Sequence, residues 1–140
     1  MWSSSKPCYG DHIRVCRGYY YHHGIYVSDD YVIHFASKEN VDRIDPKDAK
    51  IIITSLSEFL KDGILEVRIF NSEELSKKRS PSDIVNYAFM QVDKRLGTYN
   101  LISNNCEHFA NECVFGQAVS EQVEDVFSKI FGGIKRWNLV

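Results

Sequence analysis

The segment 105–109, Asn-Cys-Glu-His-Phe, is the part of the sequence best suited to chemistry, because it places the Cys106 thiol in the first turn of a predicted helix. At a helix start, unpaired backbone N–H groups and the positive end of the helix dipole stabilise a thiolate, the nucleophilic form of cysteine. The same N–H groups could stabilise an oxyanion during acyl transfer. Periodicity alone favours a packing role, since Cys106 shares an apolar stripe with Phe109 and Cys113.

A nucleophilic cysteine needs a base, and a predicted β-hairpin upstream carries three candidate histidines, His22, His23 and His34. His108 is a poorer partner for Cys106, because two residues along a helix turn the side chain by about 200°. The hairpin histidines are therefore the candidates for the base, and the register of the hairpin decides which of them share a face.

The hairpin pattern leaves two registers open. A loop of two or four residues would place His34 on the face of His23. The three-residue loop 28–30 would place His34 opposite Gly24 and on the face of His22, with Asp30 in a left-handed conformation. In that second register the two imidazoles and Gly24 form a polar site that faces the helix with the cysteine.

The elements that must position these residues change in period along the chain. β-type alternation and β-rich runs dominate the first half, and helical spacing dominates the second, which indicates an α+β architecture. Ser80 and Pro81 are a good helix start, Asn104 or Asn105 caps the next helix, and Gly116 ends it. The predicted strands are 11–17, 22–27, 31–36, 51–53, 64–70 and a short one at 98–102; the predicted helices are 57–61, 81–96 and 106–115; the predicted loops are 37–48 and 71–80.

Composition and charge restrict the class of protein. The chain has 140 residues, of which 44% are hydrophobic and 26% charged, as expected for one globular domain that folds without disulfides. Its net charge of −2 argues against a dedicated nucleic-acid binder. No apolar run approaches the roughly 20 residues of a membrane span, and the N-terminus lacks the apolar core of a secretory signal. We therefore expect a cytoplasmic protein whose cysteines, Cys8, Cys16, Cys106 and Cys113, are thiols.

Three motifs together resemble the lecithin–retinol acyltransferase family, which includes the HRAS-like suppressor phospholipases and acyltransferases. They are Asn-Cys-Glu-His-Phe at 105–109, His-His-Gly-Ile-Tyr-Val at 22–27 and Val-Ile-His at 32–34, preceded by Gly10-Asp11. The resemblance covers about residues 10–117. It divides the chain into an N-terminal tail (1–9), a catalytic domain (10–117) and a C-terminal amphipathic helix (118–140).

The resemblance implies a fold and a set of site residues. The fold is α+β, with an antiparallel sheet packed against helices in a circularly permuted papain-like, or cell-wall-peptidase-like, arrangement. Position by position, Cys106 matches the nucleophile, His22 the general base and His34 the residue that orients the base, with Asn105 supporting the helix start and the oxyanion. No cofactor and no metal are implied. The twelve-residue spacing of the two histidines selects the three-residue loop, and His23 stands where the family commonly has an aromatic residue.

The activity implied is acyl transfer through a thioester on Cys106, from a lipid acyl ester to water, an amine or an alcohol. Two other functions are alternatives to lipid acyl transfer. One is an amidase or peptidase with the same cysteine and histidine, and the other is a partner-binding module without catalysis.

The predicted C-terminal helix has apolar residues every three or four positions from Val119 to Trp137. Packing on the domain is one explanation. The other is contact with a second subunit or reversible contact with a membrane surface, and the latter would make the protein peripheral on membranes. The apolar residues concerned are Phe127, Ile130, Phe131, Ile134 and Trp137. The sequence after the domain does not match the hydrophobic anchor of several vertebrate members of the family, so we do not expect that anchor in the segment 118–140.

Overall fold

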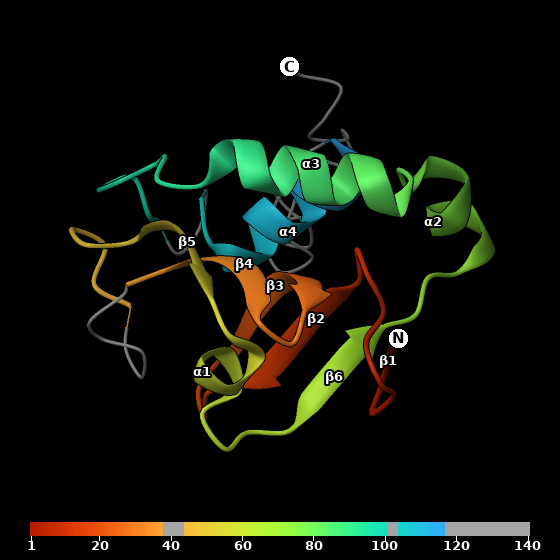
Figure 1. The fold of residues 1–140 in the computed structure, drawn as a ribbon, viewed down its shortest axis with the longest axis horizontal. Coiled ribbons are helices and arrows are strands. Elements are labelled where there is room, and N and C mark those ends of the chain that lie inside the picture. The colour runs from red at the N-terminus through yellow and green to blue at the C-terminus, as the bar shows by residue number, and fades with distance from the viewer. Residues whose placement is uncertain (38–43, 101–103, 117–140) are drawn as a thin grey trace, which may run out of the picture.

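A single antiparallel sheet of six strands forms the centre of the structure, a computed structural model that describes residues 1–37, 44–100 and 104–116 (Figure 1). Its spatial order is β1-β6-β2-β3-β4-β5, so that β6 inserts between the two N-terminal strands. The strands are β1 (Trp2–Ser3), β2 (His12–Cys16), β3 (Tyr21–Ser28), β4 (Tyr31–Ala36), β5 (Lys50–Thr54) and β6 (Leu65–Arg68). The predicted α+β class is confirmed.

Within the described residues, four helices accompany the sheet: α1 (Leu56–Leu60), α2 (Ser72–Lys77), α3 (Pro81–Gln91) and α4 (Cys106–Phe115). Ser80 caps α3 and Gly116 ends α4 with a positive φ, both as predicted. α2 lies in the segment 71–80, where a loop was predicted. Asn71 and Glu74 form a reciprocal capping box at its start, and this local pattern stabilises a short helix without a buried face.

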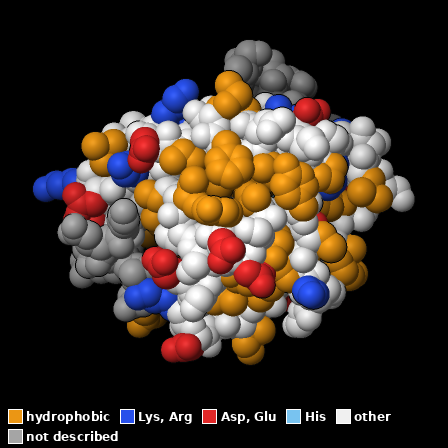
Figure 2. All heavy atoms as spheres, in the orientation of Figure 1, with side chains coloured by type: hydrophobic (Ala, Val, Ile, Leu, Met, Phe, Trp, Pro, Cys, Tyr) orange, Lys and Arg blue, Asp and Glu red, His pale blue; other side chains and the backbone are white. Residues whose placement is uncertain are grey.

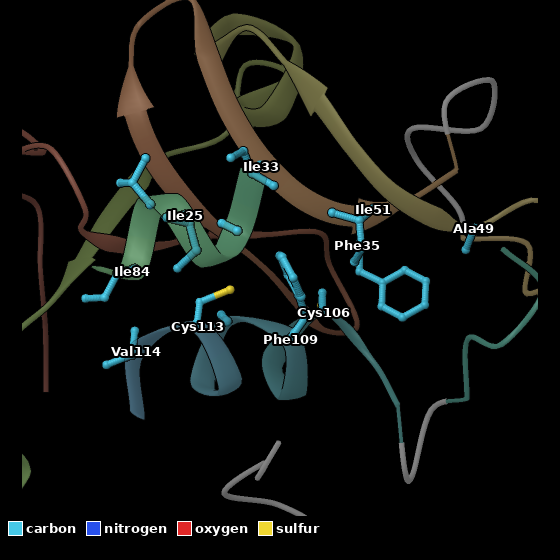
Figure 3. Packing of buried hydrophobic residues seen from close by; sticks show 13 residues of the cluster. Ile25, Ile33, Phe35, Ala49, Ile51, Ile84, Cys106, Phe109, Cys113 and Val114 are labelled. Atoms are coloured by element: carbon cyan, nitrogen blue, oxygen red, sulfur yellow. The ribbon is translucent and has the colours of Figure 1, made fainter. Parts of the chain in front are cut away.

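The two faces of the sheet carry separate apolar clusters. On one face α3 and α4 pack against β3, β4 and β5, and Figure 3 shows Phe109 and Cys113 of α4 pointing toward Ile25 and Ile33 of the sheet. The second cluster centres on Phe59 of α1 and has its own set of strand residues. Side chains alternate along each strand, so neighbouring residues of β3 belong to different clusters.

The turn of the β3–β4 hairpin differs from the predicted three-residue loop. Ser28 pairs with Tyr31, so only Asp29 and Asp30 form the turn, and Asp30 does not take the left-handed conformation. The register shifts between Tyr26 and Ser28, which marks a β-bulge. A bulge adds one residue to one strand. Here the bulge, and not a third loop residue, shifts the register of the two strands by one position.

The register that matters for the histidines is nevertheless the one predicted with that loop. Ile25 pairs with Ile33. The same register, continued by one residue on each strand, puts Gly24 opposite His34. A Cβ atom on Gly24 would lie 3.3 Å from the Cβ of His34, closer than the roughly 4.5–5.5 Å between ordinary cross-strand partners, so the two positions share one face. His22 is two residues before Gly24 on β3 and shares its face.

The N-terminal segment is attached to the sheet, whereas a tail was predicted over residues 1–9. Trp2 and Ser3 pair with Arg68 and Val67 at the edge of the sheet. The predicted C-terminal helix and its boundaries at 118–140 lie outside the described residues. In the described ranges, no helix is long and apolar enough to cross a membrane. Several apolar side chains remain exposed, and Figure 2 shows hydrophobic groups gathered across the middle of the face seen in Figure 1.

The sheet buries four histidines almost completely, at exposed fractions of 0 to 4%. Burial is the largest cause that lowers the pKa of each of them; the pKa falls to about 3 for two of the four and well below its ordinary value for the others. Because the charged form loses its hydration, these imidazoles are neutral in the folded chain. The four are His12, His22, His23 and His34.

We predict that the free energy of unfolding falls as the pH is lowered from 7.5 to 5.5. The unfolded chain binds protons at these histidines below about pH 6.5 while the folded chain does not, so each contributes a loss of about 1 kcal/mol over this range. Urea unfolding followed by tryptophan fluorescence at several pH values measures the loss. His12→Gln should reduce the slope, and a stability that does not change between pH 7.5 and 5.5 would contradict the prediction.

Candidate functional site

Asn105 fixes the start of α4 and with it the position of Cys106. Its backbone is extended, and its side-chain oxygen accepts hydrogen bonds from the backbone N–H groups of Glu107 and His108, both at 3.0 Å. An asparagine cap of this kind satisfies donors that a helix start otherwise leaves unpaired. The predicted cap is confirmed, and Cys106 is the first residue of the helix.

The thiol of Cys106 meets β3 at the level of His22. Its Sγ atom lies 3.8 Å from the carbonyl oxygen of Tyr21, and the backbone of His23 also hydrogen-bonds it. The pairing of β3 with β4 extends only to Ile25, so β4 does not occupy these backbone groups of β3. The thiol is therefore bound to the residues on either side of His22.

Burial decides the protonation state of this thiol. Cys106 is 3% exposed, and desolvation is the largest cause that raises its pKa to about 11. The Glu107 carboxylate raises the pKa further, whereas the His23 backbone and the Tyr99 hydroxyl lower it by hydrogen bonding. The expectation of a lowered pKa at the helix start is wrong, because loss of hydration outweighs the helix dipole here. The resting group is a neutral thiol that needs a base when it reacts.

His22 and His34 belong to a chain of hydrogen bonds, here called the relay, that ends at Thr54. The position of each proton in the relay follows from the hydrogen bond that Thr54 makes. The Thr54 hydroxyl donates to the carbonyl oxygen of Ser55 at 3.0 Å, so it accepts from Nε2–H of His34 at 2.9 Å. Neutral His34 then has a lone pair on Nδ1, which accepts from Nε2–H of His22 at 2.8 Å. His22 consequently carries its lone pair on Nδ1. That atom is buried and has no hydrogen-bond partner within the described part of the chain.

These two imidazoles lie on the α1 face of the sheet, and the expectation that they face α4 is wrong. Their rings stack around Phe59, with centroids 5.2 Å from His22 and 5.0 Å from His34. Gly24 makes room for this arrangement, because a Cβ there would lie 2.9 Å from the Phe59 ring. Cys106 instead belongs to the cluster on the other face, and its thiol approaches His22 along the backbone of β3.

A second histidine pair lies on the α4 face and was not predicted from the sequence. His23 Nδ1 is 2.8 Å from His12 Nε2, and His12 Nδ1 is 3.2 Å from Nη1 of Arg68. The other terminal nitrogen of Arg68, Nη2, donates to Glu74 at 2.6 Å. At its other end, His23 Nε2 lies 3.9 Å from a carboxylate oxygen of Glu107. The alternation of β2 could have indicated this pair, since His12 and His23 fall on one face once β2 and β3 are paired.

A cavity of about 350 Å³ opens beside the thiol. Its lining combines aromatic rings with polar and charged groups, a mixture usual for small-molecule sites. His23 lines it but His22 does not. The lining residues are Arg14, Cys16, Gly18, Tyr19, Tyr20, Tyr21, His23, Tyr99, Asn105, Cys106 and Glu107. No three metal-ligating side chains gather within residues 1–37, 44–100 and 104–116.

Comparison with known proteins places this site in a family. The family model described as lecithin retinol acyltransferase matches residues 5–119. Human phospholipase A and acyltransferase 3 is 34% identical over 128 residues, which cover 86% of this chain and 78% of the relative. Human phospholipase A and acyltransferase 1 is 32% identical over 132 residues, covering 89% and 77% of the two chains. The chain therefore belongs to the lecithin retinol acyltransferase family.

Proposed function

We propose that this protein is a thiol acyltransferase or phospholipase that acts on lipid acyl esters, with Cys106 as nucleophile and His22 as base. The observation that carries the proposal is the relay that leaves a buried lone pair on Nδ1 of His22. His22 lies between Tyr21 and His23, the two residues whose backbone groups hydrogen-bond the thiol. The names of the relatives, phospholipase A and acyltransferase, supply the substrate class.

In the first step, His22 Nδ1 takes the proton of Cys106 as Sγ attacks the carbonyl carbon of the ester. A neutral thiol and a neutral imidazole make this general-base catalysis, because burial disfavours a resting ion pair of the two. The carbon–sulfur bond forms, the ester carbon–oxygen bond breaks, and the protonated imidazole returns its proton to the leaving alkoxide. The thioester then passes its acyl group to water, an alcohol or an amine.

The helix start supports the oxyanion in this proposal. The side chain of Asn105 occupies the N–H groups of Glu107 and His108, so we assign the oxyanion to the N–H of Cys106 itself. Asn105 then acts by holding the first turn in place, while His34 and Thr54 act by holding the tautomer of His22. Thr54 is a positioning residue that sequence reasoning missed, because it lies on a strand 20 positions after His34.

Two alternatives remain as competitors. An amidase or peptidase would use the same cysteine and histidine, and a binding module would use neither; the names of the relatives favour ester chemistry over both. We also propose that the domain is a circularly permuted papain-like thiol hydrolase. The nucleophile at a helix start and the base on the adjacent sheet support that relation.

Contact with membranes is a further part of the proposal, because a lipid substrate must reach the cavity. Tyr19 is fully exposed and Tyr21 is 42% exposed, and both line the cavity. Aromatic side chains of this kind suit the boundary between water and lipid. The apolar positions predicted from Val119 to Trp137 would add to this contact and make the protein peripheral on membranes.

Incubation with a phospholipid should add one acyl group to Cys106, detected by intact mass and peptide mapping, and should release free fatty acid. Cys106→Ala should abolish both, and His22→Ala should slow them at least about 100-fold, because general-base catalysis typically supplies that much. Cys8→Ser changes an exposed thiol outside the cavity and should leave activity unchanged. An adduct on another cysteine, or full activity of His22→Ala, would refute the assignment.

Thr54→Val should lower kcat about 10-fold, because it removes the acceptor of His34 Nε2–H and so loosens the tautomer of His22 at the cost of one hydrogen bond. Thr54→Ser keeps the hydroxyl and should restore most of the rate. Steady-state kinetics together with urea unfolding separate this effect from a loss of stability. Equal kcat values for the two variants would remove Thr54 from the relay.

Sedimentation with anionic vesicles tests the membrane contact. The full chain should sediment with the vesicles at low salt. A smaller fraction should sediment at high salt, because salt screens the weak attraction between basic residues and anionic lipids. Phe131→Asp combined with Ile134→Asp should reduce the bound fraction several-fold by placing charge in the apolar stripe. Unchanged sedimentation of that variant would assign the predicted helix to packing on the domain.

A further inference from the structure

His23 presents a hydrogen-bond donor to the cavity, and its tautomer follows from the chain of contacts behind it. Arg68 can only donate, so Nδ1 of His12 accepts at 3.2 Å and His12 carries its proton on Nε2. That proton is donated to Nδ1 of His23 at 2.8 Å. His23 therefore carries its own proton on Nε2, the atom that lies nearest the carboxylate of Glu107.

The imidazole of His23 and the carboxylate of Glu107 lie too far apart for a direct hydrogen bond between them. Nε2 of His23 and Oε2 of Glu107 are 3.9 Å apart, beyond the 2.7–3.2 Å of a direct N–H···O bond. Burial lowers the pKa of His23 to about 3, so its ring is neutral and attracts the carboxylate only weakly. A hydroxyl oxygen placed about 2.8 Å from each atom would bridge them with an angle of roughly 90°.

We propose that His23 and Glu107 bind the hydroxyl group of the acyl acceptor, water or an alcohol, beside the thioester on Cys106. This inference rests on the function proposed above and names the acceptor class for the same site. Three observations place the acceptor there: both side chains line the cavity that the thiol lines, Glu107 directly follows Cys106, and the His23 backbone hydrogen-bonds the thiol.

The chemistry of a hydroxyl matches this pair of groups. Its oxygen accepts from Nε2–H of His23 through one lone pair, and its hydrogen is donated to the Glu107 carboxylate, which leaves a second lone pair for attack. A protonated amine has no lone pair for the histidine donor. The site therefore selects hydroxyl acceptors over ammonium groups.

In deacylation, the acceptor oxygen forms a bond to the thioester carbon, the carbon–sulfur bond breaks, and the hydroxyl proton passes to Glu107. The electron pair of the broken bond stays on Sγ, and protonated Glu107 returns the proton to the thiolate. The products are a free thiol and either a fatty acid or a new ester. His22 acts as the base in acylation, and Glu107 acts as the base in deacylation.

Burst kinetics with 4-nitrophenyl octanoate separate the two half-reactions on the full chain. The burst of nitrophenolate reports acylation of Cys106, and the steady-state rate reports deacylation. Glu107→Gln should keep the burst within about twofold and lower the steady-state rate at least about 10-fold, so that acyl-Cys106 accumulates and is seen by intact mass. His23→Phe should behave in the same way, whereas His23→Gln keeps an N–H donor and should lose less.

Glu73→Gln is the matched control, since it removes the same charge from an exposed position on α2. Its burst and steady-state rates should equal those of the unaltered chain. Release of nitrophenolate by the unaltered chain no faster than by Cys106→Ala would contradict the proposed function itself. A normal burst with an unchanged steady-state rate in Glu107→Gln would overturn the acceptor site alone, and so would an equal loss in both phases, because Glu107 would then serve acylation or folding.

Discussion

The hydrogen bond between His22 and His34 is the interaction on which the rest of the site depends. It determines which nitrogen of His22 carries a proton, and it holds only because the β-bulge keeps Gly24 opposite His34. The Phe59 ring, which closes over both imidazoles, excludes water and keeps them neutral. A packing contact on one face of the sheet thus controls the proton position on His22 that the proposed mechanism uses.

Two consecutive histidines on one strand take opposite roles because their side chains leave the strand on opposite faces. On the α1 face, the hydroxyl of Thr54 ends a relay that leaves a lone pair on His22. On the α4 face, the guanidinium of Arg68 ends a relay that leaves an N–H on His23. The thiol hydrogen-bonds the backbone of the same strand, so His22, the proposed base, and His23, the donor, are adjacent to the segment of β3 that contacts the thiol.

Burial also keeps the thiol of Cys106 and the imidazole of His22 neutral. The helix start and its Asn105 cap orient Cys106, but the desolvated surroundings raise the pKa of the thiol and lower the pKa of the imidazole. Both shifts oppose a resting thiolate. In the proposed mechanism, the neutral site keeps Cys106 protonated until a substrate carbonyl is present, and the proton moves as the sulfur attacks.

The sequence by itself predicted most of the elements and named the residues that are proposed to react. Local patterns were sufficient for the start of α3 at Ser80 and for a cap of α4 at Asn104 or Asn105, because caps depend on near neighbours. The hairpin pattern left two registers open, and the family resemblance selected the one that pairs Gly24 with His34. Only the tertiary structure decided the pKa of Cys106, the face of His22 and the partnership of His12 with His23. These depend on which distant segments exclude water or supply a proton acceptor, and Phe59, Thr54 and Arg68 do so from positions that no local pattern connects to the histidines.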